Sequence, residues 1–332
     1  MLPDQPSLSR ERTLAERVRG DFARLWPAAG AFVLAVVLLT GCATTHAPRT
    51  RGTSQDLPPR VELGAVPFFS QEDYQCGPAS LAMALASSGV PVRPEDLVAQ
   101  VYSPARQGSL PTDMIGAARR HGRLAYPIST IEDVLAELAA GNPVVVLQDL
   151  GLWRPRWHFA VAIGYDLAQE KVVLHSGTKR REVLSFARFE GTWAPSGHWG
   201  LIVLPPGRLP ATAKEQTFLE AAVGLERARQ WKAAAAAYRS AHERWPTSLG
   251  ALIGLGNSRY ALRDLSGAEQ AFRVATRLHP VAAVAFNNLA HVLAEMGNLE
   301  EALAAARQAV ALGGALEEVY RATLLDIQGQ RI

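Results

Sequence analysis

The chain has 332 residues, 48% hydrophobic and 20% charged, with a formal net charge of +3. This length allows about two domains with additional segments, and the composition is typical of globular proteins. No run of Lys and Arg forms the basic patch that binds a phosphate backbone, so the sequence argues against a nucleic-acid partner.

Residues 1–41 are predicted to be a signal peptide. Five arginines precede an apolar run at 28–39, which is too short to span a bilayer comfortably and suits a signal-peptide core. The run ends in the letters LTGC at 39–42, which resemble a bacterial lipobox. The resemblance implies cleavage before Cys42, its lipidation and, because Ala43 follows rather than Asp, an outer-membrane location facing the periplasm. A plain signal anchor is the alternative.

Residues 42–60 are predicted to form the lipidated cysteine and a flexible tether, because Thr, Pro, Arg and Ser dominate and no apolar period is present. If Cys42 carries lipid, Cys76 is the one thiol left of the two cysteines, and no intrachain disulfide can form. An unpaired cysteine in an oxidising compartment is a chemical liability, which favours a reactive role for Cys76.

The stretch 71–83 places Cys76 at the head of a predicted helix. Gly77 and Pro78 suit its first turn, because Pro at the first position gives up an N–H that has no partner there. Apolar residues then recur at helical spacing. The positive field at a helix N-terminus should lower the pKa of the thiol toward neutrality and yield a thiolate nucleophile. A buried structural cysteine is the alternative.

The first domain, predicted at 61–207, has an α+β pattern in which helices precede an antiparallel sheet. Further helices are expected at 93–101, 111–121 and 130–140. Strands are expected at 144–147, 157–165, 171–175 and 199–204. The strand at 157–165 begins with Trp157-His158, which supplies a base for Cys76.

A cysteine on an early helix and a histidine on a strand of a later sheet is the papain-like arrangement. The stretches 71–83, 141–144 and 158–166 resemble the bacteriocin-processing, double-glycine leader peptidase family, which is papain-like. The resemblance covers about 66–204, under half the chain. Members of that family are often fused to an export transporter, whereas this sequence resembles a stand-alone form, so the substrate does not carry over.

The resemblance implies a role for each site residue. Cys76 would attack the carbonyl carbon, and His158 would take the thiol proton and later protonate the leaving amine. Gln71 is the expected oxyanion donor, together with the Cys76 backbone N–H, and Gln75 is the alternative. His198 is the other candidate base.

In the resembled family an Asp ends the strand after the histidine strand, but here Ser176 stands there. Hairpin pairing brings Ser176 within reach of His158, so its hydroxyl could accept from the ring N–H. A neutral acceptor stabilises an imidazolium less than a carboxylate does, and we therefore expect modest activity. His175 should point to the opposite face, and Asp149 and Asn142 remain alternatives.

Residues 208–332 are predicted to be tetratricopeptide repeats. Pro246 and Pro280 are 34 residues apart, and Gly314 follows at the next interval, which is the period of that repeat. About three repeats are expected, with a closing helix at 315–328. Arg259 stands where the repeat usually has a large aromatic residue. An unrelated Ala-rich bundle is the alternative.

The sequence therefore predicts a membrane-anchored periplasmic cysteine peptidase that acts on a peptide or protein without cofactor or metal. Its repeats would recruit a protein partner or the substrate. The alternative is a weak or inactive adaptor lipoprotein that binds a peptide and acts through its repeats. The combination of Cys76, His158 and Gln71 favours the enzyme.

Overall fold

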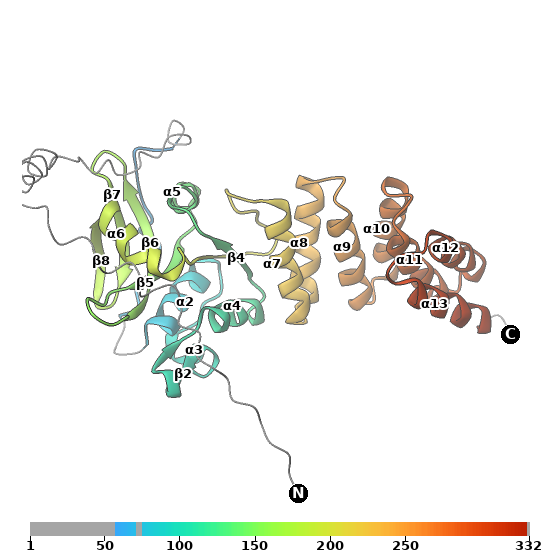
Figure 1. Cartoon of the computed structure of the whole chain (residues 1–332), viewed down its shortest axis with the longest axis horizontal. Helices are drawn as coiled ribbons and strands as arrows, with labels where there is room; N and C mark the ends of the chain where they lie inside the picture. The colour runs from blue at the N-terminus through green and yellow to red at the C-terminus, as the bar shows by residue number, and fades with distance from the viewer. Residues whose placement is uncertain (1–56, 71–74, 331–332) are drawn as a thin grey trace, which may run out of the picture. The chain divides into compact units, whose positions relative to one another are not determined.

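The computed structural model describes residues 57–70 and 75–330. They form an α+β domain with an antiparallel sheet, followed by a run of helices, as the sequence predicted (Figure 1). Cys42 and Gln71, predicted as the lipidation site and the oxyanion donor, lie outside these residues. No helix within the described ranges has the length and apolar character needed to cross a bilayer.

The elements of the α+β domain follow the chain from residue 60 to residue 204. Its strands are β1 (Arg60–Glu62), β2 (Tyr102–Ser103), β3 (Gly108–Ser109), β4 (Leu124–Ile128), β5 (Val144–Asp149), β6 (Trp157–Asp166), β7 (Lys171–Ser176), β8 (Lys179–Ser185) and β9 (Gly200–Leu204). Its α-helices are α2 (Cys76–Ser87), α3 (Pro94–Val101), α4 (Pro111–Arg120), α5 (Ile131–Ala139) and α6 (Phe186–Trp193).

The main sheet has the antiparallel order β4-β9-β5-β6-β7-β8, and β1 adds to β6. Alternate residues of β6 enter two different cores. Phe159 and Val161 pack in the core that contains α2, whereas Ala160 and Ala162 pack in the core that contains α5 and α6. Both faces of the sheet are therefore covered, which explains the unbroken apolar run in β5.

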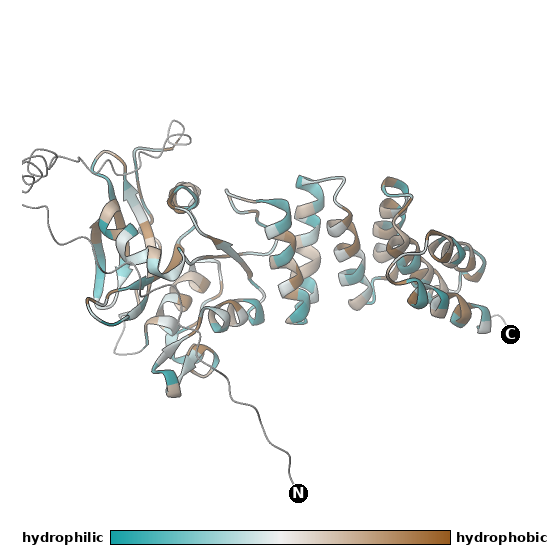
Figure 2. Cartoon of the chain, viewed as in Figure 1, coloured by the Kyte–Doolittle hydropathy of each residue, from teal (hydrophilic) through white to brown (hydrophobic). Residues whose placement is uncertain are grey.

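Seven helices make up the second part of the described chain. They are α7 (Glu215–Arg227), α8 (Trp231–Arg244), α9 (Leu249–Ala261), α10 (Leu265–Leu278), α11 (Ala283–Glu295), α12 (Leu299–Leu312) and α13 (Glu317–Gly329). The first helices of successive pairs begin 34 residues apart, at 215, 249 and 283, and α13 begins at 317. The predicted period of helix pairs with a closing helix is thus confirmed. Each helix has hydrophilic and hydrophobic residues (Figure 2).

Small residues allow the repeat helices to cross closely. A Cβ atom on Gly256 of α9 would lie 2.3 Å from Cε1 of Phe272 in α10, and one on Gly254 would lie equally close to the Tyr238 ring in α8. Arg259, at the position where an aromatic was expected, instead donates to the Gly267 carbonyl at 2.9 Å. The guanidinium thus ties α9 to the first turn of α10.

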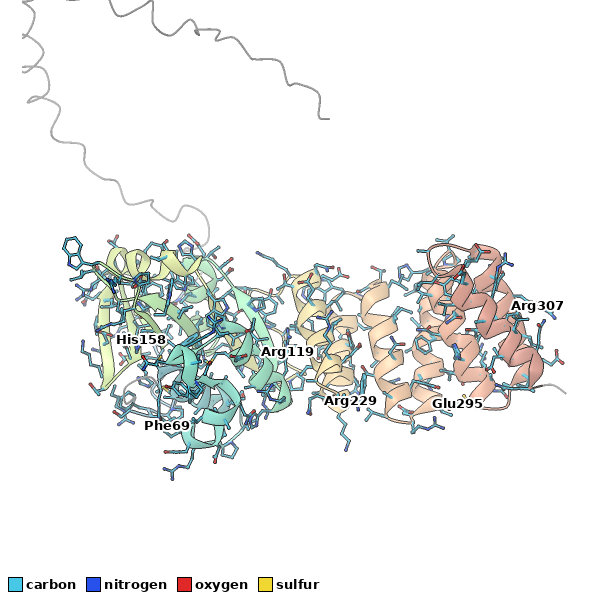
Figure 3. The ribbon with its side chains drawn as sticks, turned by 60° about the horizontal axis from the view of Figure 1, so that its bottom comes forward. Phe69, Arg119, His158, Arg229, Glu295 and Arg307 are labelled. Carbon is cyan, nitrogen blue, oxygen red and sulfur yellow. The ribbon has the colours of Figure 1, made fainter. Side chains whose placement is uncertain are left out.

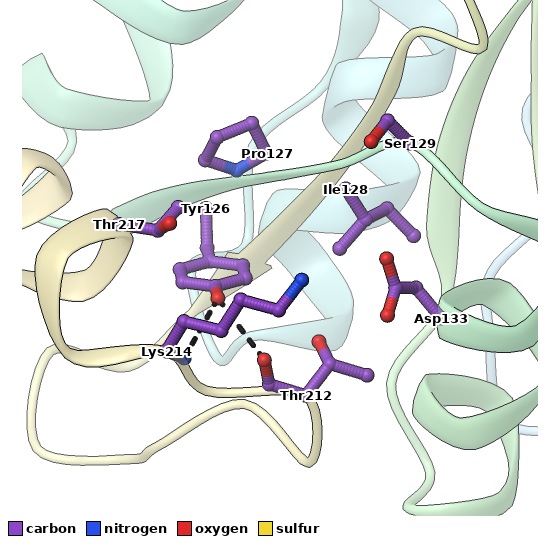
Figure 4. Close-up of a pocket in the computed structure, with 8 residues that line it drawn as sticks. All are labelled: Tyr126, Pro127, Ile128, Ser129, Asp133, Thr212, Lys214 and Thr217. Atoms are coloured by element: carbon purple, nitrogen blue, oxygen red, sulfur yellow. Dashed lines mark hydrogen bonds between the residues drawn. The ribbon is translucent and has the colours of Figure 1, made fainter.

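A buried carboxylate holds the segment between the sheet and the repeats. Glu137 of α5 is fully buried, and its Oε1 accepts from the backbone N–H and the hydroxyl of Thr212, both at 2.7 Å. Its Oε2 accepts from Asn142 Nδ2 at 2.6 Å. Tyr126 Oη donates to the Thr212 carbonyl and accepts from the Lys214 N–H, both at 3.1 Å, beside a small cavity (Figure 4).

Candidate active site

The first turn of α2 presents Cys76 beside the start of β6. Gln75 is the N-cap residue, so Pro78 lies at the third helical position, where a backbone N–H also lacks a partner. A Cβ on Gly77 would lie 2.1 Å from Ser109 Oγ, so only glycine fits this approach. Ser80 Oγ, one turn further along α2, donates to the Phe159 carbonyl at 3.1 Å and joins the helix to β6.

The pKa of the Cys76 thiol is raised, which corrects the expectation that it would be lowered. Burial is the largest cause, because it disfavours the thiolate. Hydrogen bonds from the backbone N–H groups of Phe159, Gly77 and Cys76 itself act in the opposite direction and offset only part of the burial. The helix N-terminus therefore supplies donors to the sulfur without making it an acidic thiol.

His158 is the second residue of β6 and lies in the α+β domain (Figure 3). Its Nε2 lies 3.1 Å from Ser176 Oγ. The pairing of Val161 with His175 explains this contact, because it places Ser176 across from Ala160, diagonal to His158 and on the same face. With Nε2 engaged, Nδ1 is the ring nitrogen left for the thiol.

Burial also lowers the pKa of His158. The negative charge of Glu182 raises this pKa and the positive charge of Arg156 lowers it, but burial is the larger effect. Because burial disfavours the imidazolium and the thiolate alike, the resting site at neutral pH contains a neutral histidine and a neutral Cys76 thiol.

Two of the alternative orienting residues serve other parts of the structure. Asp149 Oδ1 accepts from the backbone N–H groups of Gly151 and Arg156, both at 2.8 Å, and so closes the loop between β5 and β6. Asn142, just after the C-terminal end of α5, donates to Glu137 of that helix. Neither side chain has a hydrogen bond with His158.

The two remaining histidine alternatives are also engaged elsewhere. His175 is buried on the face of β7 opposite to Ser176, with Nε2 3.3 Å from the Val66 carbonyl and Nδ1 on the Arg180 carbonyl. His198 Nε2 lies 2.5 Å from Glu190 Oε1 in α6, and its ring packs edge-on against Trp193. For Gln75, the structure shows a backbone role only, since its carbonyl accepts from the Ala79 N–H.

Sequence reasoning missed one charged residue of this site. Glu182 of β8 accepts a hydrogen bond from the Ser176 hydroxyl and lies 2.7 Å from Lys179 Nζ. The short connection Gly177-Thr178 is a partial signal, because it permits a tight turn after β7. The strand that follows and brings Glu182 back beside Ser176 is polar and largely exposed, so its sequence pattern does not reveal it.

Comparisons with known proteins match the segment that contains the candidate site, and they also find a repeat protein. Residues 64–200, less than half the chain, match the Peptidase_C39 like family. A crystal structure described as a C39-like peptidase from Bacillus anthracis is 21% identical, with a TM-score of 0.37, over 44% of this chain and 97% of that one. A TPR protein from Thermus thermophilus is 22% identical, with a TM-score of 0.33, over 36% of this chain and 66% of that one. No curated protein matches.

Proposed function

We propose that the α+β domain is a cysteine peptidase with Cys76 as nucleophile and His158 as base. One observation carries the proposal. His158 is held through Nε2 by Ser176, while the backbone N–H of the next residue, Phe159, bonds to the Cys76 thiol at the head of α2. The family match over residues 64–200 supports the same reaction class.

The reaction follows from these positions. His158 Nδ1 takes the thiol proton as Cys76 Sγ bonds to the substrate carbonyl carbon, and the tetrahedral oxyanion forms. The Cys76 backbone N–H and the Gln71 side chain would stabilise that oxyanion. The C–N bond then breaks as His158 returns the proton to the amine, and water hydrolyses the resulting thioester. Gln71→Ala should lower kcat about 10²–10³-fold, the usual cost of one oxyanion donor.

The direct test is cleavage of a peptide library by the full chain. Wild type should produce defined fragments, and Cys76→Ala and His158→Ala should abolish turnover while keeping the circular dichroism spectrum. His198→Ala serves as the control, because this histidine pairs with Glu190 and should be dispensable. Cleavage by Cys76→Ala at the wild-type rate would refute the proposal.

A second function is favoured by the neutral state of the Cys76–His158 pair. A site with a serine acceptor and a raised thiol pKa could bind a peptide without turning it over, and the protein would then act as an adaptor through its repeats. A thiol-directed probe separates the two. An adaptor would leave Cys76 unlabelled by a peptidyl chloromethyl ketone at neutral pH, whereas a peptidase would form the adduct in a His158-dependent manner.

We also propose a lipid anchor on Cys42 that holds the protein at the outer membrane, facing the periplasm. The LTGC letters at 39–42 and the preceding apolar run support this proposal. A single acyl chain binds membranes only with an association constant on the order of 10⁴ M⁻¹, so multiple acylation is expected. Cys42→Ser should release the protein from the membrane fraction, and unchanged fractionation would contradict the anchor.

The repeat helices are proposed to recruit a protein partner or the substrate. Their support is the regular stack of helix pairs, which exposes an extended surface of the kind that repeat proteins use for binding. The test is cross-linking of the full chain in the cell envelope, compared with a chain ending at residue 281, which keeps the core that the sheet shares with the first repeat helices. A partner that depends on residues 282–332 should be cross-linked by the full chain alone, and equal cross-linking of both chains would contradict recruitment by these repeats.

A further inference from the structure

The Ser176 hydroxyl has two partners in the candidate active site. Its Oγ lies 3.1 Å from His158 Nε2, and it donates a hydrogen bond to the carboxylate of Glu182. A hydroxyl has one proton and can also accept. When the hydroxyl proton points to the carboxylate, the oxygen accepts from the histidine, and Nε2 then carries the ring proton. Nδ1 then keeps its lone pair for the thiol.

The backbone of the β7–β8 hairpin brings Glu182 to this position. Leu174 pairs with Glu182 and Ser176 pairs with Lys179, with a shift of register between these two pairs. Leu174 and Ser176 point to the same face of β7, since strand side chains alternate. Glu182 points to that face as well, diagonal to Ser176, at a distance where cross-strand side chains interact. The strand register therefore places the Glu182 side chain within reach of Ser176.

The charged and titratable groups around His158 come from three elements. The negative charge of Glu182 lies on β8 and the positive charge of Arg156 lies in the loop before β6. The third element, α2, presents the neutral Cys76 thiol at its N-terminus. Lys179 Nζ is 2.7 Å from Glu182 Oε1 and neutralises part of the carboxylate charge. The Glu182 side chain is only 21% exposed, so its charge is screened less than that of a surface carboxylate.

Burial raises the pKa of Glu182, but the hydrogen bonds from Lys179 and Ser176 more than offset that effect, and the pKa is lowered overall. Glu182 is thus ionised at neutral pH. It supplies a negative charge one hydroxyl away from the ring of His158.

We propose that Glu182 is a positioning residue that acts through Ser176 to orient His158 and to stabilise its protonated form, with Lys179 limiting the strength of this effect. The assignment rests on the peptidase function proposed above for its role in turnover. The strand after the histidine strand, β7, has no carboxylate at Ser176, and the next strand, β8, supplies one from Glu182. No proton needs to leave Ser176, because the hydroxyl polarises toward the carboxylate and accepts from the imidazolium N–H.

The test is a pH titration of His158 in the full chain, in which NMR of selectively labelled histidine side chains reports the protonation of the ring. The chain has eight histidines, so His158→Asn identifies the resonance. Glu182→Gln should lower the pKa of His158, since an opposite charge close to a group favours its charged form. Lys179→Gln should raise it by a smaller amount, because the Glu182 charge is no longer neutralised.

The matched control is Glu190→Gln, which removes the same charge from the other carboxylate that pairs with a histidine, His198. This change should leave the pKa of His158 unchanged. In a Ser176→Ala background the effect of Glu182→Gln should shrink to less than half, because the hydroxyl link is gone. An unchanged His158 pKa in Glu182→Gln, an equal shift in Glu190→Gln, or a full shift without Ser176 would each overturn the proposal.

Turnover provides the second readout. If the peptidase is active, Glu182→Gln should lower kcat about tenfold, with a smaller change in KM, since the charge stabilises the protonated histidine formed during the reaction. If wild type cleaves no peptide but His158 titrates as expected in all variants, the peptidase function fails and the assignment of Glu182 stands. If peptides are cleaved but Glu182→Gln leaves the pKa of His158 unchanged, the assignment of Glu182 fails and the peptidase function stands.

Discussion

Burial acts on both members of the Cys76–His158 pair in the same direction, against charge. Backbone N–H groups of α2 and β6 favour the thiolate of Cys76, and the negative charge of Glu182 favours the imidazolium of His158. Both pKa shifts nevertheless favour the neutral forms. A thiolate–imidazolium pair needs each charge to stabilise the other in a shared low-dielectric site. In the proposed peptidase reaction, the proton transfer from Cys76 to His158 would therefore accompany the attack on the substrate and would not precede it.

The thiol should accordingly react late in a pH titration. Alkylation of Cys76 by iodoacetamide, in a Cys42→Ser chain that has no other thiol, should have its midpoint above that of N-acetylcysteine measured in parallel. The sign follows from burial, because a raised pKa means that the reactive thiolate appears only at higher pH. Rapid alkylation below pH 7 would show instead that the ion pair exists in the resting site.

Removal of the Ser176 hydroxyl should weaken turnover without abolishing it. Ser176→Ala should lower kcat tenfold or less, as expected from losing one hydrogen bond of about 1 kcal/mol. Ser176→Asp places a carboxylate directly on Nε2 and should raise kcat above the Ser176→Ala value. Ser129→Ala, which removes an exposed hydroxyl outside the site, is the control. An unchanged kcat in Ser176→Ala would show that Ser176 has no role in the site.

At the scale of helices, Gly256 sets the distance between α9 and α10. Gly256→Ala should destabilise the repeats by about 1–3 kcal/mol, because the new Cβ would clash with Phe272 inside a packed crossing. Gly191→Ala is the matched control. Gly191 is also helical, in α6, but has no atom within 4 Å of the added Cβ, so this change should be neutral or stabilising by about 0.5–1 kcal/mol.

Thermal unfolding followed by circular dichroism measures both variants. If Gly256→Ala is as stable as wild type, the close crossing of α9 and α10 is not a constraint on the repeats. If Gly191→Ala is equally destabilising, the loss reflects a general intolerance of the chain and says nothing about the crossing.

Elements with strong periodicity were predictable, and those at the sheet edges were not. The helix pairs follow a 34-residue period that can be counted in the sequence. In contrast, β4 contains Pro127, which argues against a strand, but β4 is an edge strand, where Pro is tolerated. The other edge, β8, is polar and largely exposed, so it has no apolar alternation to reveal it. The helix α6, which follows β8 directly, was missed as well.

The candidate site was predictable as far as local patterns reach. Ser176 and His158 lie together because a hairpin of known length joins their strands. Glu182 could not be placed without β8, since its role depends on a strand that the sequence does not reveal. The sign of the Cys76 pKa shift depends on burial, which only the tertiary packing determines.

At the scale of the whole molecule, the core of the α+β domain continues into the first repeat. Phe218 of α7 and Tyr238 of α8 belong to the same cluster of buried residues as Tyr126 of β4. Glu137 reinforces this continuity with polar contacts, because both of its oxygens accept from groups that flank the junction. A buried carboxylate with several donors and no basic partner is costly to expose and costly to remove.

Glu137→Ala should therefore loosen the junction between the sheet and the repeats. The change leaves the Thr212 N–H and the Asn142 amide without an acceptor, and each buried unsatisfied group costs about 1–3 kcal/mol. We expect a lower unfolding temperature and faster proteolytic cleavage in the segment 205–214, measured by mass spectrometry of the fragments. Glu132→Ala on the same helix, which has no such partners, should cost only about 0.3–1 kcal/mol through the helix dipole.

The pattern of cleavage decides what Glu137 does. Faster cleavage at 205–214 with little change elsewhere would mean that the carboxylate fixes the linker and that the repeats are held to the sheet through it. Uniform cleavage of the α+β domain would mean that Glu137 supports α5 and the core, and that the hydrophobic contacts of Phe218 alone hold the junction. Wild-type resistance in Glu137→Ala would contradict both roles, because a fully buried carboxylate with three hydrogen bonds cannot be removed from a rigid junction without a measurable loss.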